Sequence, residues 1–526
     1  MPTKKNLLII AITSLILANL MVYVPRVLAR KFTDIDRLNM LVDVGYELVE
    51  NYVEKPDQKE ITEAAVRGMI KALNDRYTTY LDEEDLKHFD KQVQGAFSGI
   101  GAEITDRDTD YIKIVSPLED SPAWRSGVMA GDLILEINGE LVKDLSVYDA
   151  VDKLTGEEGT DVAIKVRHEN ADEEVITITR ARINVATVKG LRRDADHHWD
   201  FMLDPEARIG YIRIIQFAKN TTRQVHEAVQ SLVDQDARGL IIDLRFNPGG
   251  LLESAVGISD MFLDGGQRIV SIKGRKVKER VHESTSDALM LDTPVVVLGN
   301  ELSASGSEIL AGALAENGRA KYIGTRTFGK GSVQQTRLLG AGNEGMHYGA
   351  IKMTTALYYL PSGRNIHRKE DAEVWGVDPD EGFYVPMNNE QIRKMILRRR
   401  ESDVLRRDTD DEAGVDEFTA AANSPDWIEE NLADPQLAAG LRALLGKIET
   451  GDWPTVGEFG KEAIIRRQSI ERWKRMREEL TKRLTEVDAK ITRLEAGENV
   501  QEVDEDASAD AGTDDGAQDD SADGEE

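Results

Sequence analysis

The spacing of apolar residues changes along the chain and separates a helical N-terminal region from a mixed α/β body. Residues 34–91 carry apolar side chains every three or four positions in two successive groups, which predicts two amphipathic helices. The groups are Leu38, Leu41, Val42, Leu48 and Val49, then Ile61, Ala65, Met69 and Leu73. Such stripes are more often core than interface. From about residue 184 to 385, strand-like and helix-like segments alternate, which predicts an α/β fold.

Ser305 lies between a predicted strand and a predicted helix. The apolar run 294–298 precedes it, and residues 307–314 have helical periodicity that stops at an Asn-Gly pair. A turn of this kind exposes a side chain above a sheet, and the free N–H groups of the first helical turn can hold a developing oxyanion. Ser305 is therefore a candidate nucleophile, and the N–H of Gly306 is a candidate oxyanion donor.

Lys330 and Gln334 supply the remaining groups that a serine hydrolase without a catalytic histidine needs. A lysine can take the serine proton only when neutral, which costs roughly 4 to 5 kcal/mol at pH 7 unless burial lowers its pKa. Few charged residues other than Arg326 flank Lys330, so the local sequence suits burial. If residues 330–334 are extended, both side chains point to one face and Gln334 can orient the amine. A lone serine or lysine is usually solvated, so the hypothesis needs the whole set.

A glycine turn forms a second candidate element of the site. Residues 239–245 read as a buried parallel strand, and Phe246-Asn247-Pro248-Gly249-Gly250 leads from it into a predicted helix. Glycines at such a turn let backbone N–H groups approach a ligand closely. The segment taken alone is equally compatible with a simple strand-to-helix turn.

These segments together resemble the carboxyl-terminal processing peptidases, also called tail-specific proteases. The motifs are Asp243-Leu244-Arg245 with Asn247-Pro248-Gly249-Gly250, Ser303-Ala304-Ser305-Gly306-Ser307-Glu308-Ile309, and Thr327-Phe328-Gly329-Lys330-Gly331-Ser332-Val333-Gln334. Weaker matches, Ala65-Val66-Arg67-Gly68-Met69 and Thr354 to Arg364, extend the resemblance over roughly residues 40–385.

The resemblance implies a role for each residue of the set. Ser305 would be the nucleophile, Lys330 the general base and Gln334 its orienting partner. The oxyanion hole would combine the Gly306 amide with one from the Gly249-Gly250 turn, and which of those two donates stays open. The implied fold of residues 184–385 is a crotonase-like spiral of ββα units. Gly306 and Arg76 depart from the usual alanine and proline, and neither departure removes a catalytic side chain.

Residues 95–183 resemble an inserted PDZ domain. Phe97-Ser98-Gly99-Ile100-Gly101-Ala102-Glu103-Ile104 is similar to a carboxylate-binding loop, in which the backbone at Gly99, Ile100, Gly101 and Ala102 would bind a peptide's C-terminus. Asn138-Gly139 predicts a hairpin turn within this domain. A PDZ scaffold without catalytic activity is the main competing class, and only the serine, lysine and glutamine set argues against it.

Three other chemistries fit the sequence poorly. Gly324, Gly329 and Lys330 have the spacing of a phosphate-binding loop, but Gly331 stands where Ser or Thr should hold magnesium. No G-x-S-x-G or G-x-S-G-G segment supports a histidine-based triad. The adjacent His197-His198 pair diverges on a strand, so a solvated loop is favoured over a metal site. We expect no metal and no cofactor.

The N-terminus predicts export. An apolar stretch runs from Leu7 to Val24 behind Lys4-Lys5, close to the roughly 20 residues of a spanning helix. Residues 1–30 are thus a signal peptide or an uncleaved anchor, and Pro25-Arg26 favours the anchor. We expect the catalytic body in the cell envelope, periplasmic or extracytoplasmic and tethered to the cytoplasmic membrane. By resemblance, the helical region 31–94 implies a homodimer.

The C-terminal part is predicted to be helical and then disordered. Between residues 386 and 498, apolar residues at Ile470, Trp473, Leu480, Leu484, Val487, Ile491 and Leu494 follow a heptad seam interrupted by Arg477, as in a helical hairpin or a coiled coil. Residues 499–526 contain twelve acidic and no basic residues. The chain has no cysteine and a net charge of −30, which argues against disulfides and against nucleic-acid binding.

The sequence therefore predicts an exported serine endopeptidase that acts on protein or peptide substrates with free C-termini. The PDZ domain would capture the substrate tail, and Ser305 would form an acyl-enzyme after Lys330 removes its proton.

Overall fold

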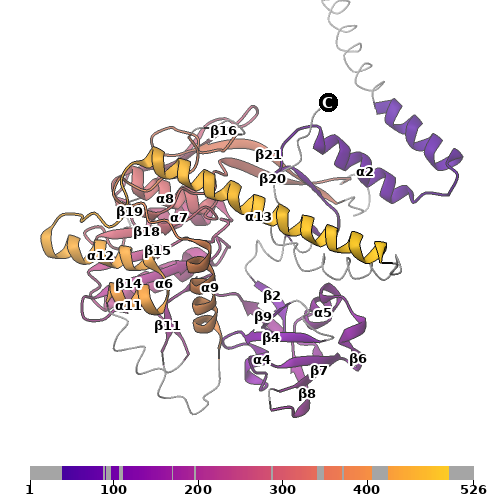
Figure 1. Cartoon of the computed structure of the whole chain (residues 1–526), viewed down its shortest axis with the longest axis horizontal. Helices are drawn as coiled ribbons and strands as arrows, with labels where there is room; N and C mark the ends of the chain where they lie inside the picture. Colours follow the sequence, from indigo (N-terminus) through magenta and orange to yellow (C-terminus); the bar gives the residue numbers. More distant parts are fainter. Residues whose placement is uncertain are drawn as a thin grey trace, which may run out of the picture. The chain divides into compact units, whose positions relative to one another are not determined.

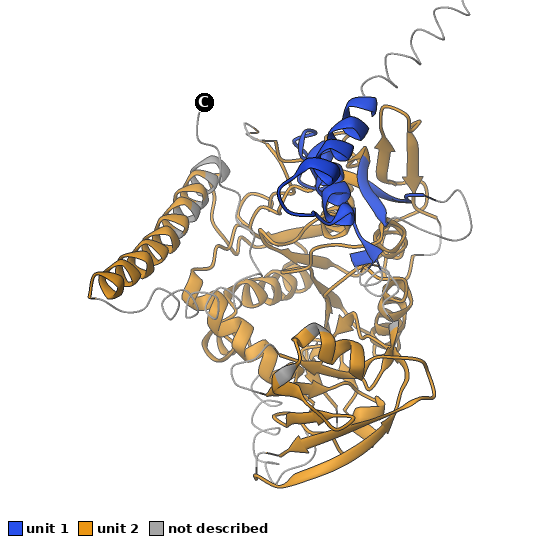
Figure 2. Cartoon of the chain, turned by 90° about the vertical axis from the view of Figure 1, so that its right-hand side faces the viewer, with its two compact units in different colours: residues 1–86, 334–354 blue, residues 87–333, 355–526 orange. Residues whose placement is uncertain are grey.

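The computed structural model describes most of the chain between residues 38 and 496 (Figure 1). The described residues are 38–83, 85–86, 89, 96–105, 111–168, 170–194, 197–285, 288–340, 349–369, 372, 374–405 and 424–496. The chain divides into two compact units (Figure 2). One contains residues 1–86 and 334–354, and the other contains residues 87–333 and 355–526.

The first unit contains the two predicted N-terminal helices. They are residues 38–51 and α2 (Gln58–Lys71), which begins where the Asp57 carboxylate accepts a hydrogen bond from the Lys59 N–H at 2.7 Å. Strand β1 (Thr79–Leu81) pairs antiparallel with residues 350–352 of β21 (Ala350–Tyr359). Contrary to the expectation of a buried stripe, α2 has no buried residue and most apolar positions of the first helix are exposed.

The second unit is built around a largely parallel sheet. Its strand order is β10-β14-β15-β18-β19, with β13 antiparallel to β14. The strands are β10 (Val188–Lys189), β13 (Met202–Asp204), β14 (Ile209–Ile214), β15 (Gly239–Asp243), β18 (Val295–Gly299) and β19 (Ala320–Gly324). Every residue of β14, β15 and β18 is buried, as expected for a parallel sheet covered on both faces.

Helices cover both faces of this sheet. On one face, α6 (Thr221–Asp234), α7 (Leu252–Asp260) and α8 (Gly306–Glu316) pack against alternate strand residues such as Ile242 and Val297. On the other face, α11 (Pro425–Asn431) and α12 (Pro435–Thr450) pack against Ile241 and Val296. The C-terminal helices therefore complete the core of the α/β body.

A smaller sheet and a two-stranded hairpin carry further strands of this unit. Strand β16 (Arg268–Lys273) pairs with β17 (Arg280–Glu283) and with residues 357–359 of β21. Strand β20 (Ser332–Leu338) pairs with β21, and both strands run from this unit into the first. A short hairpin joins β11 (Arg192–Arg193) to β12 (Trp199–Asp200).

The predicted PDZ region has its own sheet and its own apolar core. The sheet order is β3-β4-β5-β7-β8, with β6 paired to β5, and β2 pairs with β9. The elements are β2 (Ala96–Gly99), β3 (Ala102–Ile104), β4 (Ile112–Pro117), α4 (Pro122–Arg125), β5 (Leu133–Ile137), β6 (Glu140–Leu141), the 3₁₀ turn η1 (Val142–Asp144), α5 (Val147–Leu154), β7 (Asp161–Arg167), β8 (Glu173–Thr179) and β9 (Ala181–Asn184). Asn138 and Gly139 both have positive φ, which confirms the predicted hairpin turn.

Two further helices lie toward the C-terminus. Helix α9 (Asn389–Asp403) carries a run of arginines, and α13 (Lys461–Glu495) is one uninterrupted helix of 35 residues. The heptad seam therefore lies on a single helix, and the hairpin reading is wrong. No described helix is both long and apolar enough to cross a bilayer; the predicted anchor at residues 7–24 and the acidic tail at 499–526 lie outside the described residues.

Candidate active site

Ser305 occupies the turn between β18 and α8, as the apolar pattern predicts. Its backbone has φ 54° and ψ −109°, outside the regions that a non-glycine residue ordinarily adopts. Holding a residue there costs on the order of 1–3 kcal/mol and requires support from the surrounding structure. Ser305 is half-buried, while the next nine residues of α8 are buried. The serine is thus held on a strained turn at the N-terminus of a buried helix.

The support comes first from the Glu308 side chain, which is fully buried. Its Oε2 accepts hydrogen bonds from the N–H groups of Ser305 and Lys330, both at 2.8 Å. Its Oε1 accepts from the Thr327 hydroxyl at 2.6 Å and the Gly329 N–H at 2.7 Å. One oxygen thus joins the backbones of the predicted nucleophile and the predicted base, although these residues are far apart in sequence.

The carboxyl group of Glu308 has an unusual titration. Burial raises its pKa to about 7, and its hydrogen bonds to Thr327, Gly329, Ser305 and Lys330 act in the opposite direction. Every group around it donates a hydrogen bond, which favours the ionised form, but burial favours the protonated form and has the larger effect. Glu308 therefore titrates near neutral pH at the junction of the segments that carry the predicted nucleophile and the predicted base.

Tyr358 joins the same two segments from the other side. Its hydroxyl lies 3.1 Å from the carbonyl oxygen of Ser305 and also contacts the carbonyl oxygen of Lys330. The Tyr358 side chain is almost fully buried and comes from the end of β21 that pairs with β16. The backbones at 305 and 330 are therefore linked twice, through their N–H groups and through their carbonyls.

The glycine turn lies directly against the serine turn. A side chain at Gly249 would place its Cβ 2.8 Å from the Cβ of Ser305 and 2.7 Å from the nitrogen of Gly306, and the φ of Gly249 is 94°. Only glycine fits this conformation and this close approach. The Gly249 N–H donates to the Asn247 side chain at 2.8 Å. Neither the Gly250 N–H nor the Gly306 N–H has an acceptor among the described residues.

Asn247 and Ser303 hold the two turns together. The carbonyl of Asn247 accepts from the Ala304 N–H at 3.0 Å and from the Ser307 hydroxyl at 2.9 Å. The Ser303 hydroxyl donates to the carbonyl of Leu244 at 2.8 Å. The free N–H groups are therefore set before any ligand binds, which is the arrangement that an oxyanion hole requires.

Lys330 is half-buried and lies between two glycines on the way into β20. The Gly329 carbonyl accepts from the Arg368 N–H at 2.8 Å, and the Gly331 carbonyl accepts from the Tyr358 N–H at 3.0 Å. The flanking charge of Arg326 is paired with Asp378 and lies over the Trp375 ring at 4.4 Å. Gln334 lies on β20 in the other unit, where its amide donates to the Thr354 hydroxyl at 3.3 Å.

A buried ionic network anchors the strand that precedes the glycine turn. The Arg245 guanidinium contacts Asp243 at 2.6 Å and Asp434, the N-cap of α12, at 2.6 Å. Arg399 of α9 bonds to the same two carboxylates, at 2.6 and 3.3 Å. Burial alone would raise the pKa of the Asp243 and Asp434 carboxyls, but Arg245 and Arg399 together lower it below its usual range. Two arginines and two aspartates balance their charges here.

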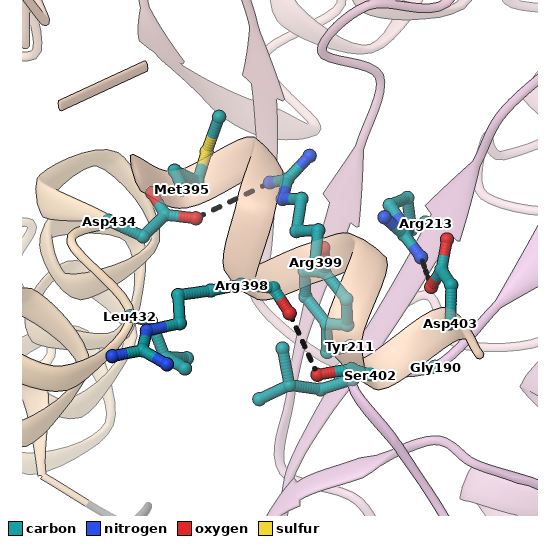
Figure 3. Close-up of a pocket in the computed structure, with 11 residues that line it drawn as sticks. Gly190, Tyr211, Arg213, Met395, Arg398, Arg399, Ser402, Asp403, Leu432 and Asp434 are labelled. Atoms are coloured by element: carbon teal, nitrogen blue, oxygen red, sulfur yellow. Dashed lines mark hydrogen bonds and ion pairs between the residues drawn. The ribbon is translucent and has the colours of Figure 1, made fainter. Parts of the chain in front are cut away.

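A small pocket lies beside this network, lined by α9, Tyr211 and Leu432 (Figure 3). Figure 3 shows Arg399 reaching Asp434 across the pocket, and Arg213 paired with Asp403 at the end of α9. The pocket holds about 20 Å³, room for little more than one water molecule. It belongs to the framework of the site and is too small for a peptide.

The predicted carboxylate loop of the PDZ region joins β2 to β3. Ile100 is buried in the PDZ core, and Gly101 has φ 77° with Ser121 and Ile183 filling the space where a side chain would lie. Ala102 begins β3, which is an edge strand because β4 is its only partner among the described strands. An edge strand that follows such a loop can accept a peptide as an additional strand.

One group of described side chains has the proximity that a metal site would need: Glu119, Asp120 and His198. The Arg193 guanidinium already binds Glu119 at 2.6 Å, so a cation competes with any metal there. His197 does not join this group and instead contacts the Trp124 ring edge-on at 5.5 Å.

Glu308, Tyr358, Asn247 and Asp434 are the supporting residues that sequence reasoning missed. Ser305 and Glu308 have the Ser-x-x-Glu spacing of a helix capping box, and this signal predicts the bond from Glu308 back to the Ser305 N–H. No local signal predicts that the same carboxylate reaches residue 330.

Comparisons with known proteins agree with this geometry. Residues 208–383 match the model of peptidase family S41, residues 113–168 match a PDZ domain, and residues 29–85 match the N-terminal domain of the activating protease CtpB. The carboxy-terminal-processing protease of Bartonella bacilliformis is 36% identical over 378 residues, which cover 69% of this chain and 81% of that protein. Carboxy-terminal processing protease CtpA of Bacillus subtilis is 34% identical over 335 residues, covering 64% and 67%.

Among solved structures, the photosystem II D1 C-terminal processing protease is 30% identical, with 65% of this chain and 86% of that chain covered and a TM-score of 0.37. The chain belongs to the carboxy-terminal processing proteases of peptidase family S41. It is a serine-type peptidase with a PDZ domain, and the inactive scaffold reading has no support.

Proposed function

We propose that this peptidase cleaves protein substrates near their C-termini with Ser305 as nucleophile and Lys330 as general base. The observation that carries the proposal is the shared contact of both backbones with one Glu308 oxygen. This contact places two distant segments side by side, and no other serine and lysine in the α/β body share such a link among the described residues.

In the first step, the Ser305 oxygen attacks the substrate carbonyl while the neutral Lys330 amine takes the hydroxyl proton. The carbonyl oxygen becomes an oxyanion, which the N–H groups of Gly306 and Gly250 stabilise. Gly250 is preferred over Gly249 because the Gly249 N–H already donates to Asn247. Lys330 then protonates the leaving amine as the C–N bond breaks, and an acyl-enzyme remains.

In the second step, Lys330 removes a proton from water, whose oxygen attacks the acyl carbon. The ester bond to Ser305 breaks, the serine regains its proton, and the new C-terminus leaves as a carboxylate. Gln334 is proposed to orient the lysine amine during both steps.

The PDZ domain is proposed to deliver the substrate. The loop formed by Gly99, Ile100, Gly101 and Ala102 would bind the terminal carboxylate, while the peptide adds to the free edge of β3. The relatives' names, carboxy-terminal processing proteases, support this choice of substrate end.

Activity of the purified full chain on an unstructured peptide tests the catalytic assignment. The Ser305→Ala and Lys330→Ala variants should each lose essentially all cleavage. Lys321→Ala is the matched control, because Lys321 lies on β19 and pairs with Asp380 at 3.4 Å away from the serine turn. Retained cleavage in either catalytic variant would refute the assignment.

The N-terminal segment is proposed to anchor the chain in the cytoplasmic membrane, with the catalytic body in the periplasmic or extracytoplasmic space. The apolar run from Leu7 to Val24 supports the anchor. The exposed apolar residues of helix 38–51 and α2 support a homodimer through these helices. Carbonate-resistant membrane association of the whole chain, lost when residues 1–30 are removed, tests the anchor.

A further inference from the structure

Helix α13 carries an apolar seam whose side chains are well exposed in the part of the chain that the structure describes. The seam residues are Ile470, Trp473, Leu480, Leu484, Val487, Ile491 and Leu494, whose exposed fractions lie between 38% and 60%. Along the helix, successive seam positions are three or four residues apart, and Arg477 occupies the one seam position, between Trp473 and Leu480, that is not apolar. If Ile470 is position a, the seam fills every a and d position of more than three heptads except one.

The polarity of the helix confirms that this seam is its only apolar face between residues 470 and 495. Outside the seam, the only apolar residues in this stretch are Met476 and Ala489, at positions g and f. Helix α13 runs without a break through the whole repeat (Figure 1). A sustained a/d seam on an otherwise polar helix requires a second helix of matching pattern.

The charges beside the seam identify that second helix. Over residues 483–495, the C-terminal half of the seam, positions g hold Arg483 and Lys490, whereas positions e hold Asp488 and Glu495. In a parallel, in-register pair of identical helices, each g residue meets the e residue five positions further along the other copy. Arg483 then faces Asp488 of the second copy, and Lys490 faces Glu495 of the second copy, so both pairs attract.

The opposite orientation is disfavoured by the same residues. In an antiparallel pair whose seams overlap fully, Ile470 faces Leu494 of the second copy and g positions face g positions, which brings Arg483 close to Arg483 of the second copy. Neither the Arg483–Asp488 pair nor the Lys490–Glu495 pair then forms. Within its own helix, Arg483 already bonds to Glu479 at 2.8 Å in an exposed pair worth only a few tenths of a kcal/mol. That pair does not prevent Arg483 from interacting across the seam.

Arg477 is consistent with two strands in a fixed register. A single charged residue at an a position lowers the stability of a coiled coil and specifies its register and oligomer state. The long arginine stem can cover the seam while the guanidinium reaches solvent, which the open sides of a two-stranded coil allow. Arg477 is exposed in the single chain.

We propose that α13 pairs with α13 of a second copy of this chain as a parallel, in-register, two-stranded coiled coil over residues 470–494. This interface is separate from the N-terminal helices and independent of the catalytic assignment.

The absence of native cysteine makes the test direct, since one introduced thiol reports on one position. The purified full-length chain is prepared as three single variants: Leu480→Cys and Leu494→Cys at d positions, and Ala489→Cys at an outward f position as the matched control. A disulfide needs Cβ atoms about 3.5–4.5 Å apart, so only facing positions link efficiently. After mild oxidation, both d variants should give at least about five times more linked dimer than the control.

Charge reversal supplies a second arm in the Leu494→Cys background. Arg483→Glu with Lys490→Glu should reduce the linked dimer severalfold, and adding Asp488→Lys with Glu495→Lys should restore it.

Each other outcome overturns the proposal. Linkage only in a mixture of the Leu480→Cys chain with a Leu484→Cys chain, whose positions face each other when the seams overlap antiparallel, means an antiparallel pair. Equal linkage in the Ala489→Cys control means chance collision between chains held together elsewhere. Absence of linkage in both d variants means that α13 binds another partner or none.

Discussion

Replacing Glu308 by glutamine separates the catalytic value of this carboxylate from its effect on stability. Glutamine has the same shape, but its amide must present one nitrogen to the four donors around the site. With the nitrogen in place of Oε2, it would face the N–H groups of both Ser305 and Lys330. With the nitrogen in place of Oε1, it faces one N–H, from Gly329, and the Thr327 hydroxyl, which can accept.

The second orientation is therefore preferred, and it leaves only the Gly329 N–H unpaired. A buried unpaired N–H costs about 1–3 kcal/mol. The carboxylate has a cost of its own, because burial raises the pKa of Glu308 from 4.5 to about 7. That difference corresponds to about 3 kcal/mol between the protonated and ionised forms.

The sign of the pH effect follows from the raised pKa. The protonated group contributes its full stability below about pH 4.5, and this contribution is lost as the pH rises through about 7. Glutamine does not titrate. Glu308→Gln should therefore be less stable than wild type by about 1–3 kcal/mol at pH 5, and equally stable or slightly more stable at pH 8.

Activity should fall at pH 8, where the stability of Glu308→Gln is expected to equal or slightly exceed that of the wild type. At pH 8 the charge-assisted bonds to Ser305 and Lys330 become neutral ones, which are roughly half as strong. A loss of about 1 kcal/mol for each bond predicts a fall in kcat of about tenfold to thirtyfold. The carboxylate would then be retained for catalysis at the expense of stability.

Urea unfolding at pH 5 and pH 8, together with peptide cleavage at pH 8, measures both effects on the full chain. Glu316→Gln is the matched control, because Glu316 ends the same helix and binds Arg364 at 2.7 Å near the surface. If Glu308→Gln cleaves within twofold of wild type at pH 8, or if its stability deficit is equal at both pH values, the reasoning is refuted.

Three further predictions concern the framework and the PDZ loop. Gly249→Ala should reduce kcat by more than about 100-fold, because the added Cβ would lie 2.8 Å from the Cβ of Ser305. The control Gly266→Ala, at φ 81° in open space, should lose only about 1 kcal/mol of stability and no activity. Asp434→Asn should lower the free energy of urea unfolding by about 3–5 kcal/mol, because two buried guanidinium groups would then share only the Asp243 carboxylate. A loss no larger than that of the exposed Asp426→Asn, about 0.5 kcal/mol, would contradict this. Gly101→Val should raise the KM for a peptide with a free C-terminus to the KM of the same peptide with an amidated C-terminus. If the variant still distinguishes the two peptides as the wild type does, the loop does not bind the substrate carboxylate.

Much of the architecture was readable from the chain, because local periodicity and turn chemistry carry it. The segment 239–245 predicted a buried parallel strand and the apolar run 294–298 predicted a second strand, and the structure confirms both in one parallel sheet. The Asn138-Gly139 turn, the two N-terminal helices and the strand-to-helix turn at Ser305 follow from the same kind of signal. The family was recognisable because its motifs are contiguous.

The sequence by itself determined the elements, the family and the candidate nucleophile and base, since each depends on residues that are neighbours along the chain. Only the tertiary structure decided that Glu308 joins residues 305 and 330, that Gly249 is already committed to Asn247, and that α12 and Asp434 complete the core. It also decided that the N-terminal stripe and the α13 seam stay exposed. The physical reason is that hydrogen-bond partners and burial depend on which distant segments meet, and periodicity shows only which face of an element is apolar.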